Sequence, residues 1–228
     1  MKYFLDAEFI EDAVFIDLIS IGIVAEDGRE FYALNIDCDW NKASQWVREN
    51  VLTRLPDKPN DFEYSEVHKA EGWLRHSAIG DEVLKFVGGE TYSINYPSKS
   101  NGAAVRGLKV GRRIKEGNPK PEFWAYYADS DWVVFYQLFG TMMDLPEGFP
   151  LYCRDLKQEE DRLGIDLSKA VPQENEHDAL DDARWNWKAF KYLETLRTTL
   201  EIPLPILGSA PAPTVKLTTS HSGTGNTK

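Results

Sequence analysis

Hydrophobic and polar positions follow a strand-like pattern at the start of the chain. Residues 3–8 and 18–25 are rich in β-branched and aromatic side chains, and a third such run spans residues 31–36. The turn signal Asp27-Gly28 separates the second run from the third. The three runs therefore predict an antiparallel three-strand meander.

A helical period replaces this pattern from residue 41, where apolar residues return every three or four positions until Pro56. The segments expected after the meander are, in order, a helix over 41–55, a helix over 79–87, a buried strand over 123–128, a helix over 132–139, a strand over 149–153 and an amphipathic helix over 179–200. Helices and strands that alternate in this way are typical of a parallel arrangement.

The fold class predicted by these patterns is α/β. We expect a mixed sheet, with the antiparallel meander first and alternating helices and parallel strands after it, and with helices on both faces. The length of 228 residues fits one core, which we place in a domain over residues 1–202. Residues 203–228 are rich in Pro, Ser, Thr and Gly, and this composition predicts a flexible tail.

Charge is unevenly distributed along the chain. The net charge is 26 − 37 = −11, which argues against binding of duplex nucleic acid over the whole surface. Residues 98–120 nevertheless carry seven basic residues and one acid, a net charge of +6, so the remainder carries −17. We interpret the segment at about 90–120 as a basic insertion. It follows a single-stranded nucleic-acid backbone, with Arg112 and Arg113 as candidate contacts, or engages a structured RNA or another protein, or is a solvated loop.

The cysteine content and the N-terminus bear on the compartment. Cys38 and Cys153 are too few for a disulfide framework or a cysteine-based zinc site. Asp6 and Glu8 interrupt the first apolar stretch before a signal-peptide region develops, and no stretch approaches the ~20 apolar residues of a membrane span. We expect a cytoplasmic protein without a membrane partner.

Four carboxylates stand at positions where a shared site is expected. Asp6 and Glu8 are two apart in a strand and project from the same face. Asp131 follows a predicted strand, and Asp182 lies in the first turns of the last helix, so all four could meet near strand ends. Their summed charge of −4 would call for two divalent cations, and oxygen ligands suit Mg²⁺ or Mn²⁺. Such an ion pair is typical of phosphoryl displacement.

A histidine precedes the last of these carboxylates by five positions. On a regular helix His177 and Asp182 would diverge by 140°, so they share a site only if His177 lies outside the helix. Asp178 is a suitable N-cap with Asp181 three positions later, which leaves His177 on the incoming loop. A histidine there could deprotonate an attacking water, and phosphodiester hydrolysis is the reaction this predicts.

The order of these motifs resembles a known family. Asp6-x-Glu8, a central Asp131 and His177 followed by Asp182 resemble the DEDDh class of 3′-to-5′ exonucleases, which have a ribonuclease H-like fold. Residues 4–12, 18–30, 137–140 and 177–184 look like the exoribonuclease AS subgroup, which hydrolyses adenylate-rich RNA. The resemblance covers most of residues 1–200. It implies two Mg²⁺ or Mn²⁺ ions on the four carboxylates, His177 as general base, and release of 5′-nucleoside monophosphates from single-stranded RNA.

Several alternatives stay open at this stage. A DNA exonuclease of the same class, or a non-catalytic acidic mimic of nucleic acid, would also suit parts of the pattern. Asp129 competes with Asp131, which we prefer because it matches the family position. Phe9 and Trp132 could stack on a base or could belong to the core. Exonucleases of this class are often dimers, so a homodimer is a further alternative.

Overall fold

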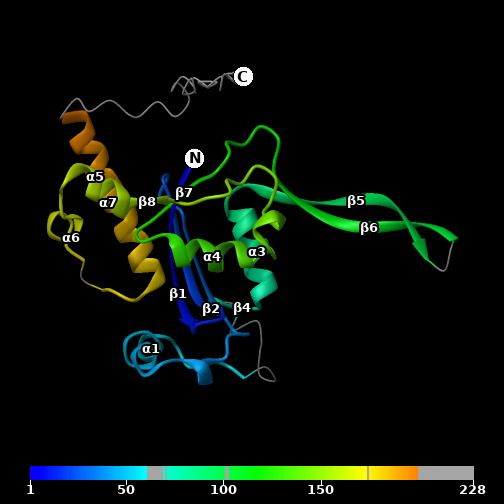
Figure 1. The fold of residues 1–228 in the computed structure, drawn as a ribbon, viewed down its shortest axis with the longest axis horizontal. Coiled ribbons are helices and arrows are strands. Elements are labelled where there is room, and N and C mark those ends of the chain that lie inside the picture. The colour runs from blue at the N-terminus through cyan, green and yellow to red at the C-terminus, as the bar shows by residue number, and fades with distance from the viewer. Residues whose placement is uncertain (61–68, 70, 101–102, 174, 200–228) are drawn as a thin grey trace, which may run out of the picture.

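A mixed sheet with helices on both faces forms the body of the protein (Figure 1). The computed structural model describes residues 1–60, 69, 71–100, 103–173 and 175–199. Within these residues the main sheet has six strands in the order β4-β3-β2-β1-β7-β8. Their bounds are β1 Lys2–Glu11, β2 Ile16–Ala25, β3 Glu30–Asn35, β4 Trp73–Leu74, β7 Glu122–Ala125 and β8 Arg154–Asp155. β1, β2 and β3 are antiparallel neighbours, whereas β4, β7 and β8 join in parallel.

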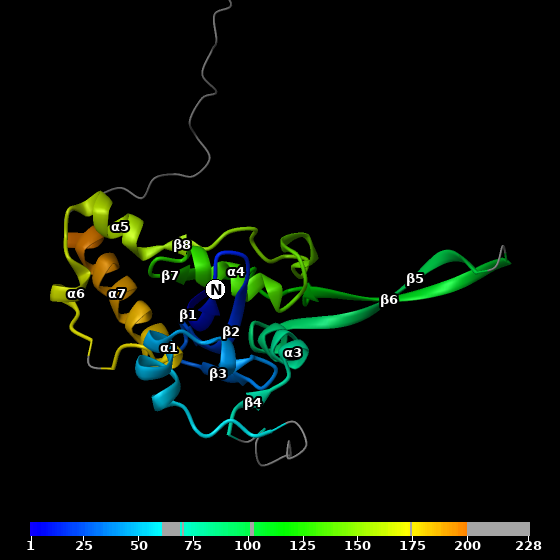
Figure 2. The same cartoon turned by 60° about the horizontal axis from the view of Figure 1, so that its bottom comes forward.

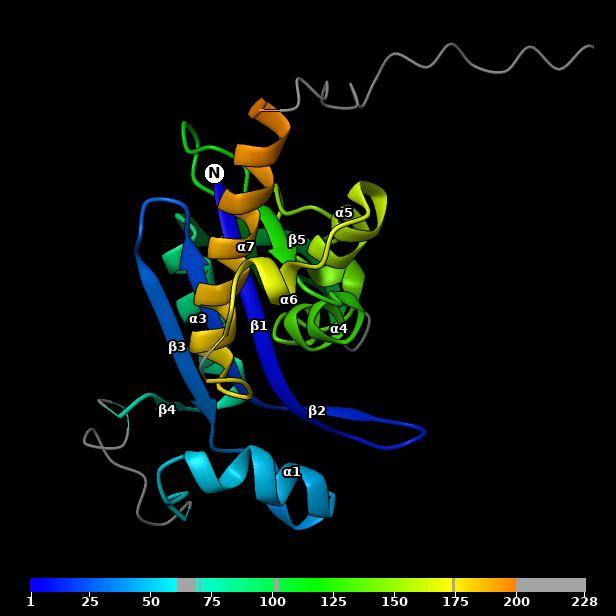
Figure 3. The same ribbon diagram turned by 90° about the vertical axis from the view of Figure 1, so that its left-hand side faces the viewer.

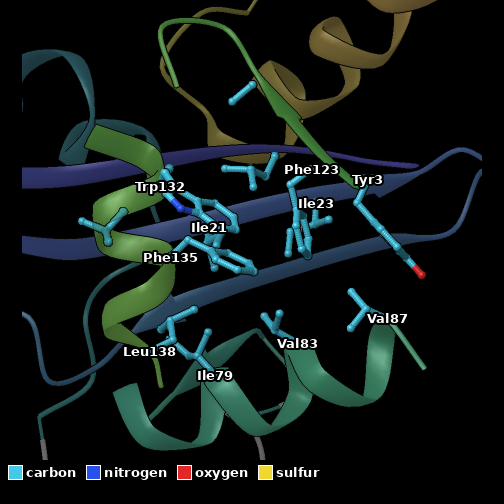
Figure 4. Close-up of a cluster of buried hydrophobic side chains, with 14 of the residues drawn as sticks. Tyr3, Ile21, Ile23, Ile79, Val83, Val87, Phe123, Trp132, Phe135 and Leu138 are labelled. Carbon is cyan, nitrogen blue, oxygen red and sulfur yellow. The ribbon is translucent and has the colours of Figure 1, made fainter. Parts of the chain in front are cut away.

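The helices lie on two sides of this sheet. On one side α3 and α4 pack against β1 and β2 through a large apolar cluster, part of which Figure 4 shows. On the other side α7 lies across β1, where Phe4 and Trp124 meet Phe190 (Figure 3). The helices are α1 Gln45–Asn50, α3 His76–Phe86, α4 Asp129–Gln137, α5 Leu156–Leu163, α6 Leu167–Ala170 and α7 Ala179–Thr199.

Successive side chains of β1 point to opposite faces of the sheet. Leu5 and Ala7 enter the cluster with α3 and α4, while Phe4 contacts α7. Asp6 and Glu8 share the parity of Phe4 and so face the α7 side near the end of the strand. The strand therefore places apolar residues in one core and carboxylates beside the start of α7.

The meander and the helices α3, α4 and α7 were predicted at the correct places. The prediction of a single helix over 41–55 was wrong. The Oγ of Ser44 accepts from the backbone N–H of Val47 and caps a new helix that starts at Gln45, which splits the segment. It forms α1 between two 3₁₀ turns, Trp40–Lys42 and Leu52–Arg54. The strand over 149–153 was also wrong, since β8 begins at Arg154. A third 3₁₀ turn, Met142–Asp144, and the helices α5 and α6 were not predicted.

The basic insertion forms a hairpin rather than a loop. Its strands β5, Gly89–Ser100, and β6, Ala103–Ile114, make a separate two-stranded sheet that projects from the body (Figure 2). The predicted tail, residues 203–228, lies outside the described residues, so the domain boundary at 202 stays a prediction. In the described part of the chain no helix is long and apolar enough to cross a membrane.

Candidate active site

A cavity of about 600 Å³ lies beside the C-terminal half of β1, and acidic residues from three elements line it. β1 contributes Asp6 and Glu8, α4 contributes Asp131, and the start of α7 contributes Asp182. His177, on the loop before α7, lines the same cavity. The structure thus brings together all five residues that the sequence motifs single out.

Asp131 faces the cavity from the first turn of α4. Its Oδ1 accepts a hydrogen bond of 2.9 Å from the backbone N–H of Ala7, the residue between the two carboxylates of β1. The side chain is only 6% exposed. Asp129 lies in the same turn but is exposed and does not line the cavity, so the geometry favours Asp131 over it.

His177 and Asp182 reach the cavity as their spacing predicts. Asp178 caps α7, since its Oδ1 accepts from the backbone N–H groups of Leu180 and Asp181 at 3.1 and 3.0 Å. His177 precedes this cap with a left-handed backbone, φ 67°. Its N–H donates to Oδ2 of Asp182 at 3.0 Å, which ties the loop to the helix.

Two further contacts hold this loop. The Nε2 of Gln173 donates to Oδ1 of Asp182, so both oxygens of this carboxylate have a partner. The ring of Trp46, on α1, meets the His177 ring edge-on with centroids 4.8 Å apart. The imidazole therefore has an aromatic neighbour on the side of the cavity formed by α1.

Gly22 sets the distance between α7 and the sheet. It lies opposite Asp6 in the register of β1 and β2. A Cβ at this position would lie 2.2 Å from the carbonyl oxygen of Ala179, the first residue of α7. Since real side chains do not approach so closely, glycine is what allows the end of α7 that bears Asp182 to lie against the sheet beside Asp6.

The carboxylates raise one another's pKa. Burial and the neighbouring acids raise the pKa of Asp6 well above its usual value. Burial above all raises the pKa of Asp131 to about 8, with Glu8 and Asp182 adding to the effect. The pKa of Glu8 and that of Asp182 each rise to about 7, again through burial first and the nearby carboxylates second. A cation in the cavity would relieve this repulsion.

The donor set suits a metal ion. One potential ligand atom each from Glu8, His177 and Asp182 lies within 4.8 Å of the other two. Carboxylate oxygens suit a hard divalent cation such as Mg²⁺ or Mn²⁺. The arrangement can thus hold cations beside a histidine able to exchange a proton.

Comparison with known proteins identifies the family of this chain. The protein-family model described as the 3′-5′ exoribonuclease Rv2179c-like domain matches residues 1–194. The chain belongs to this family. It is 33% identical to the 3′-5′ exoribonuclease Rv2179c of Mycobacterium tuberculosis strain H37Rv over 193 residues, 85% of this chain and 93% of that protein. The 3′-5′ exoribonuclease MT2234.1 of strain CDC 1551 matches with the same identity and coverage.

This family membership makes the protein an enzyme, a 3′-5′ exonuclease that acts on RNA. The interpretation as a non-catalytic acidic mimic is thereby removed. The family name says nothing about which residues of this exoribonuclease perform the chemistry, so their roles rest on the cavity described above.

The four residues that we expected to contact substrate lie in different surroundings. Phe9 lines the cavity beside Glu8. Trp132 belongs to the core instead, because its ring stacks on Phe135 at 4.8 Å and is 8% exposed. Arg112 and Arg113 lie at the base of the hairpin, outside the residues that line the cavity.

The cavity of this exoribonuclease also contains aromatic residues that the sequence did not single out as substrate contacts. Trp46 is 52% exposed and Tyr127 is 63% exposed, and both line the cavity. Tyr127 has a left-handed backbone, φ 56°, and its N–H donates to Oδ1 of Asp155 at 3.2 Å. No sequence motif signals such a backbone. The apolar spacing over 41–55 likewise does not distinguish Trp46 as an exposed residue.

Proposed function

We propose that this protein is a metal-dependent 3′-to-5′ exoribonuclease of the DEDDh class, with a ribonuclease H-like fold. It removes nucleotides from single-stranded RNA ends and releases 5′-nucleoside monophosphates. The observation that supports this most is the convergence of Asp6, Glu8, Asp131, Asp182 and His177 on one cavity. The order of these residues in the chain is the order of the DEDDh motifs.

We assign two divalent ions, Mg²⁺ or Mn²⁺, to the four carboxylates. The acids carry a summed charge of −4 when ionised, and their raised pKa values express the cost of that charge in the absence of cations. When bound, the pair of ions supplies stabilisation of the attacking and leaving oxygens of the phosphodiester. Oxygen donors of this kind match the preference of hard cations.

His177 is assigned as the general base. The capped start of α7 and the N–H bond to Asp182 fix its backbone at the edge of the cavity. Its imidazole accepts the proton of an attacking water as the water's oxygen bonds to phosphorus. The bond from phosphorus to the 3′-oxygen of the preceding nucleotide then breaks.

RNA is the substrate class we assign, because both M. tuberculosis relatives are named exoribonucleases. A preference for adenylates follows from the resemblance to the AS subgroup. The exposed rings of Trp46 and Tyr127 provide surfaces on which bases can stack, which contributes about 1 to 3 kcal/mol per base in single-strand binders. DNA stays the alternative substrate.

Substitution of single residues tests the assignment. Asp6→Asn and Asp182→Asn should abolish turnover with Mg²⁺ while the melting temperature stays near that of the wild type. His177→Ala should lower kcat by about 10²-fold or more, while RNA binding remains. Asp129→Asn is the matched control, since it removes an exposed carboxylate from the same turn of α4 as Asp131. Normal turnover in either Asp→Asn variant would remove that residue from the site.

A further inference from the structure

The hairpin β5–β6 is an arm that extends beyond the body. Its strands pair over their whole length, from Gly89 opposite Ile114 to Ser100 opposite Ala103. Twelve extended residues per strand give it a length of roughly 40 Å. It starts beside α3 and points away from α7, α5 and α6 (Figures 1 and 2). An isolated two-stranded ribbon is of marginal stability in water, so an arm of this length calls for a function.

The base of the arm is firmly attached to the body. The N–H of Ile114 donates to the carbonyl of Glu147 at 2.9 Å, and the N–H of Glu147 donates to the carbonyl of Arg112 at 2.9 Å. The Nε of Arg112 donates to Asp81 on α3 at 3.1 Å. Since three contacts join neighbouring elements here, the base gives the arm a defined direction.

The arm is positively charged and the body is negatively charged. Residues 89–114 contain five basic residues and one acid, a net charge of +4, so the rest of the chain carries −11 − 4 = −15. Lys109 on β6 is exposed, and the described part of the chain gives it no ion pair. Farther out, Lys99 and Arg106 lie on the strands near the tip.

An aromatic ring and a guanidinium group also meet at the arm. The guanidinium of Arg113 lies over the ring of Tyr92, 4.7 Å from its centroid. Arg113 also pairs with Glu90 at 3.0 Å, and both side chains are partly exposed. Exposed pairs of this kind contribute little free energy, so a phosphate can replace the carboxylate at low cost.

We propose that this arm binds the phosphate backbone of the RNA substrate at a distance from the 3′ end. The inference rests on the proposed function, because an RNA whose 3′ end enters the cavity approaches a body of net charge −15. Five carboxylates line that cavity, Glu11 among them, so the body repels the polyanion, whereas the arm attracts it. Among the arm residues whose exposure the structure describes, 89–95 and 109–114, Val110 is the large hydrophobic side chain that is exposed, at 55%. The net charge of +4 on the arm therefore favours RNA over a second copy as its partner.

Removal of the outer arm tests the proposal. Ser93 lies opposite Val110, so an Asn-Gly turn that replaces residues 94–109 keeps the inner pairs and the anchored base. The deletion removes Lys99, Arg106 and Lys109. A second variant of the full chain replaces these three residues by Gln, so that charge is tested without shortening. The matched control replaces three exposed lysines of the α6–α7 side by Gln: Lys169, Lys188 and Lys191.

Binding is measured by fluorescence anisotropy in chelator, where no cleavage occurs. RNAs of about 4 and about 16 nucleotides span the footprints of single-strand binding modules. We expect both arm variants to weaken binding of the longer RNA about tenfold and to reduce the slope of log K against log salt by about 2, from three lost phosphate contacts. Binding of the shorter RNA and the affinities of the control should be unchanged.

Unchanged affinity of both arm variants for the longer RNA would overturn the proposal. Sedimentation of the same variants tests whether the arm instead binds a second copy of the chain. Loss of a dimer with unchanged RNA affinity would assign the arm to that second copy. Failure of the proposed function is a separate result: the protein would then not cleave RNA with Mg²⁺ or Mn²⁺, whatever the arm variants bind in chelator.

Discussion

The close approach of α7 to Gly22 offers a sharp test of how the fold assembles the site. Gly22→Ala adds a Cβ that would lie 2.2 Å from the carbonyl oxygen of Ala179, while ordinary contact begins at 3.4 Å. The start of α7 must therefore retreat by about 3.4 − 2.2 = 1.2 Å, or the sheet must bend. That retreat would move His177 and Asp182 away from Asp6.

The size of the effect follows from this displacement. Overpacking of this kind costs about 1 to 3 kcal/mol, which lowers the melting temperature of a chain of this size by roughly 2 to 12 °C. Misplacement of catalytic groups by about 1 Å can cost 10²-fold in rate, so we expect kcat to fall about 100-fold at a temperature where the variant is folded.

A second glycine gives the matched control. Gly80→Ala on α3 places a Cβ 2.6 Å from the carbonyl oxygen of Leu138, a similar clash between other elements. It should lower the melting temperature but leave kcat near that of the wild type, since neither Gly80 nor Leu138 lines the cavity. The assay is release of mononucleotides from single-stranded RNA with Mn²⁺. Wild-type turnover in Gly22→Ala, or an equal loss in both variants, would refute the positional explanation.

Three further predictions concern the cavity. In chelator the protein should lose stability as pH rises from about 4 to about 7. The reason is that the folded-state pKa of Glu8 and of Asp182 is raised to about 7, from 4.5 and 3.8. Thermal melts measure this loss, and saturating Mn²⁺ should remove it. Trp46→Ala should lower kcat about tenfold, because the His177 ring loses the aromatic side chain that holds its position, and Trp46→Phe should restore much of the rate. A kcat of Trp46→Ala equal to that of the wild type would show that Trp46 does not position His177. Tyr127→Ala should raise KM by roughly 5-fold or more, whereas Tyr127→Phe should not, and an unchanged KM in the alanine variant would remove the stacking role.

The five residues that meet at the cavity could be predicted to converge because their signals are local. Asp6 and Glu8 are two residues apart in a strand, and strand geometry alone puts them on one face. The capping residue Asp178 likewise separates His177 from α7 whatever the rest of the fold does. The expected meander and the last helix were correct for similar reasons, since their periods extend over many residues.

The features that the sequence did not reveal depend on distant contacts. Tyr127 has a positive φ, and Asp155, far along the chain, accepts its N–H. The strand expected over 149–153 has an apolar composition, yet Phe149 packs against Phe123 and Phe135 without joining the sheet. Gly and Ser residues weaken the strand signal of the arm, so no strand was predicted in the basic insertion.

The most direct test of the central claim is incubation of a 5′-labelled single-stranded RNA with the protein, with Mn²⁺ or with chelator. Poly(A), a mixed RNA and the matching DNA are compared. We predict a ladder that shortens from the 3′ end with Mn²⁺, is absent with chelator, and runs fastest on poly(A). Cleavage that persists in chelator, internal cuts, or no cleavage of any strand by folded, metal-bound protein would contradict the assignment as a metal-dependent 3′-to-5′ exoribonuclease.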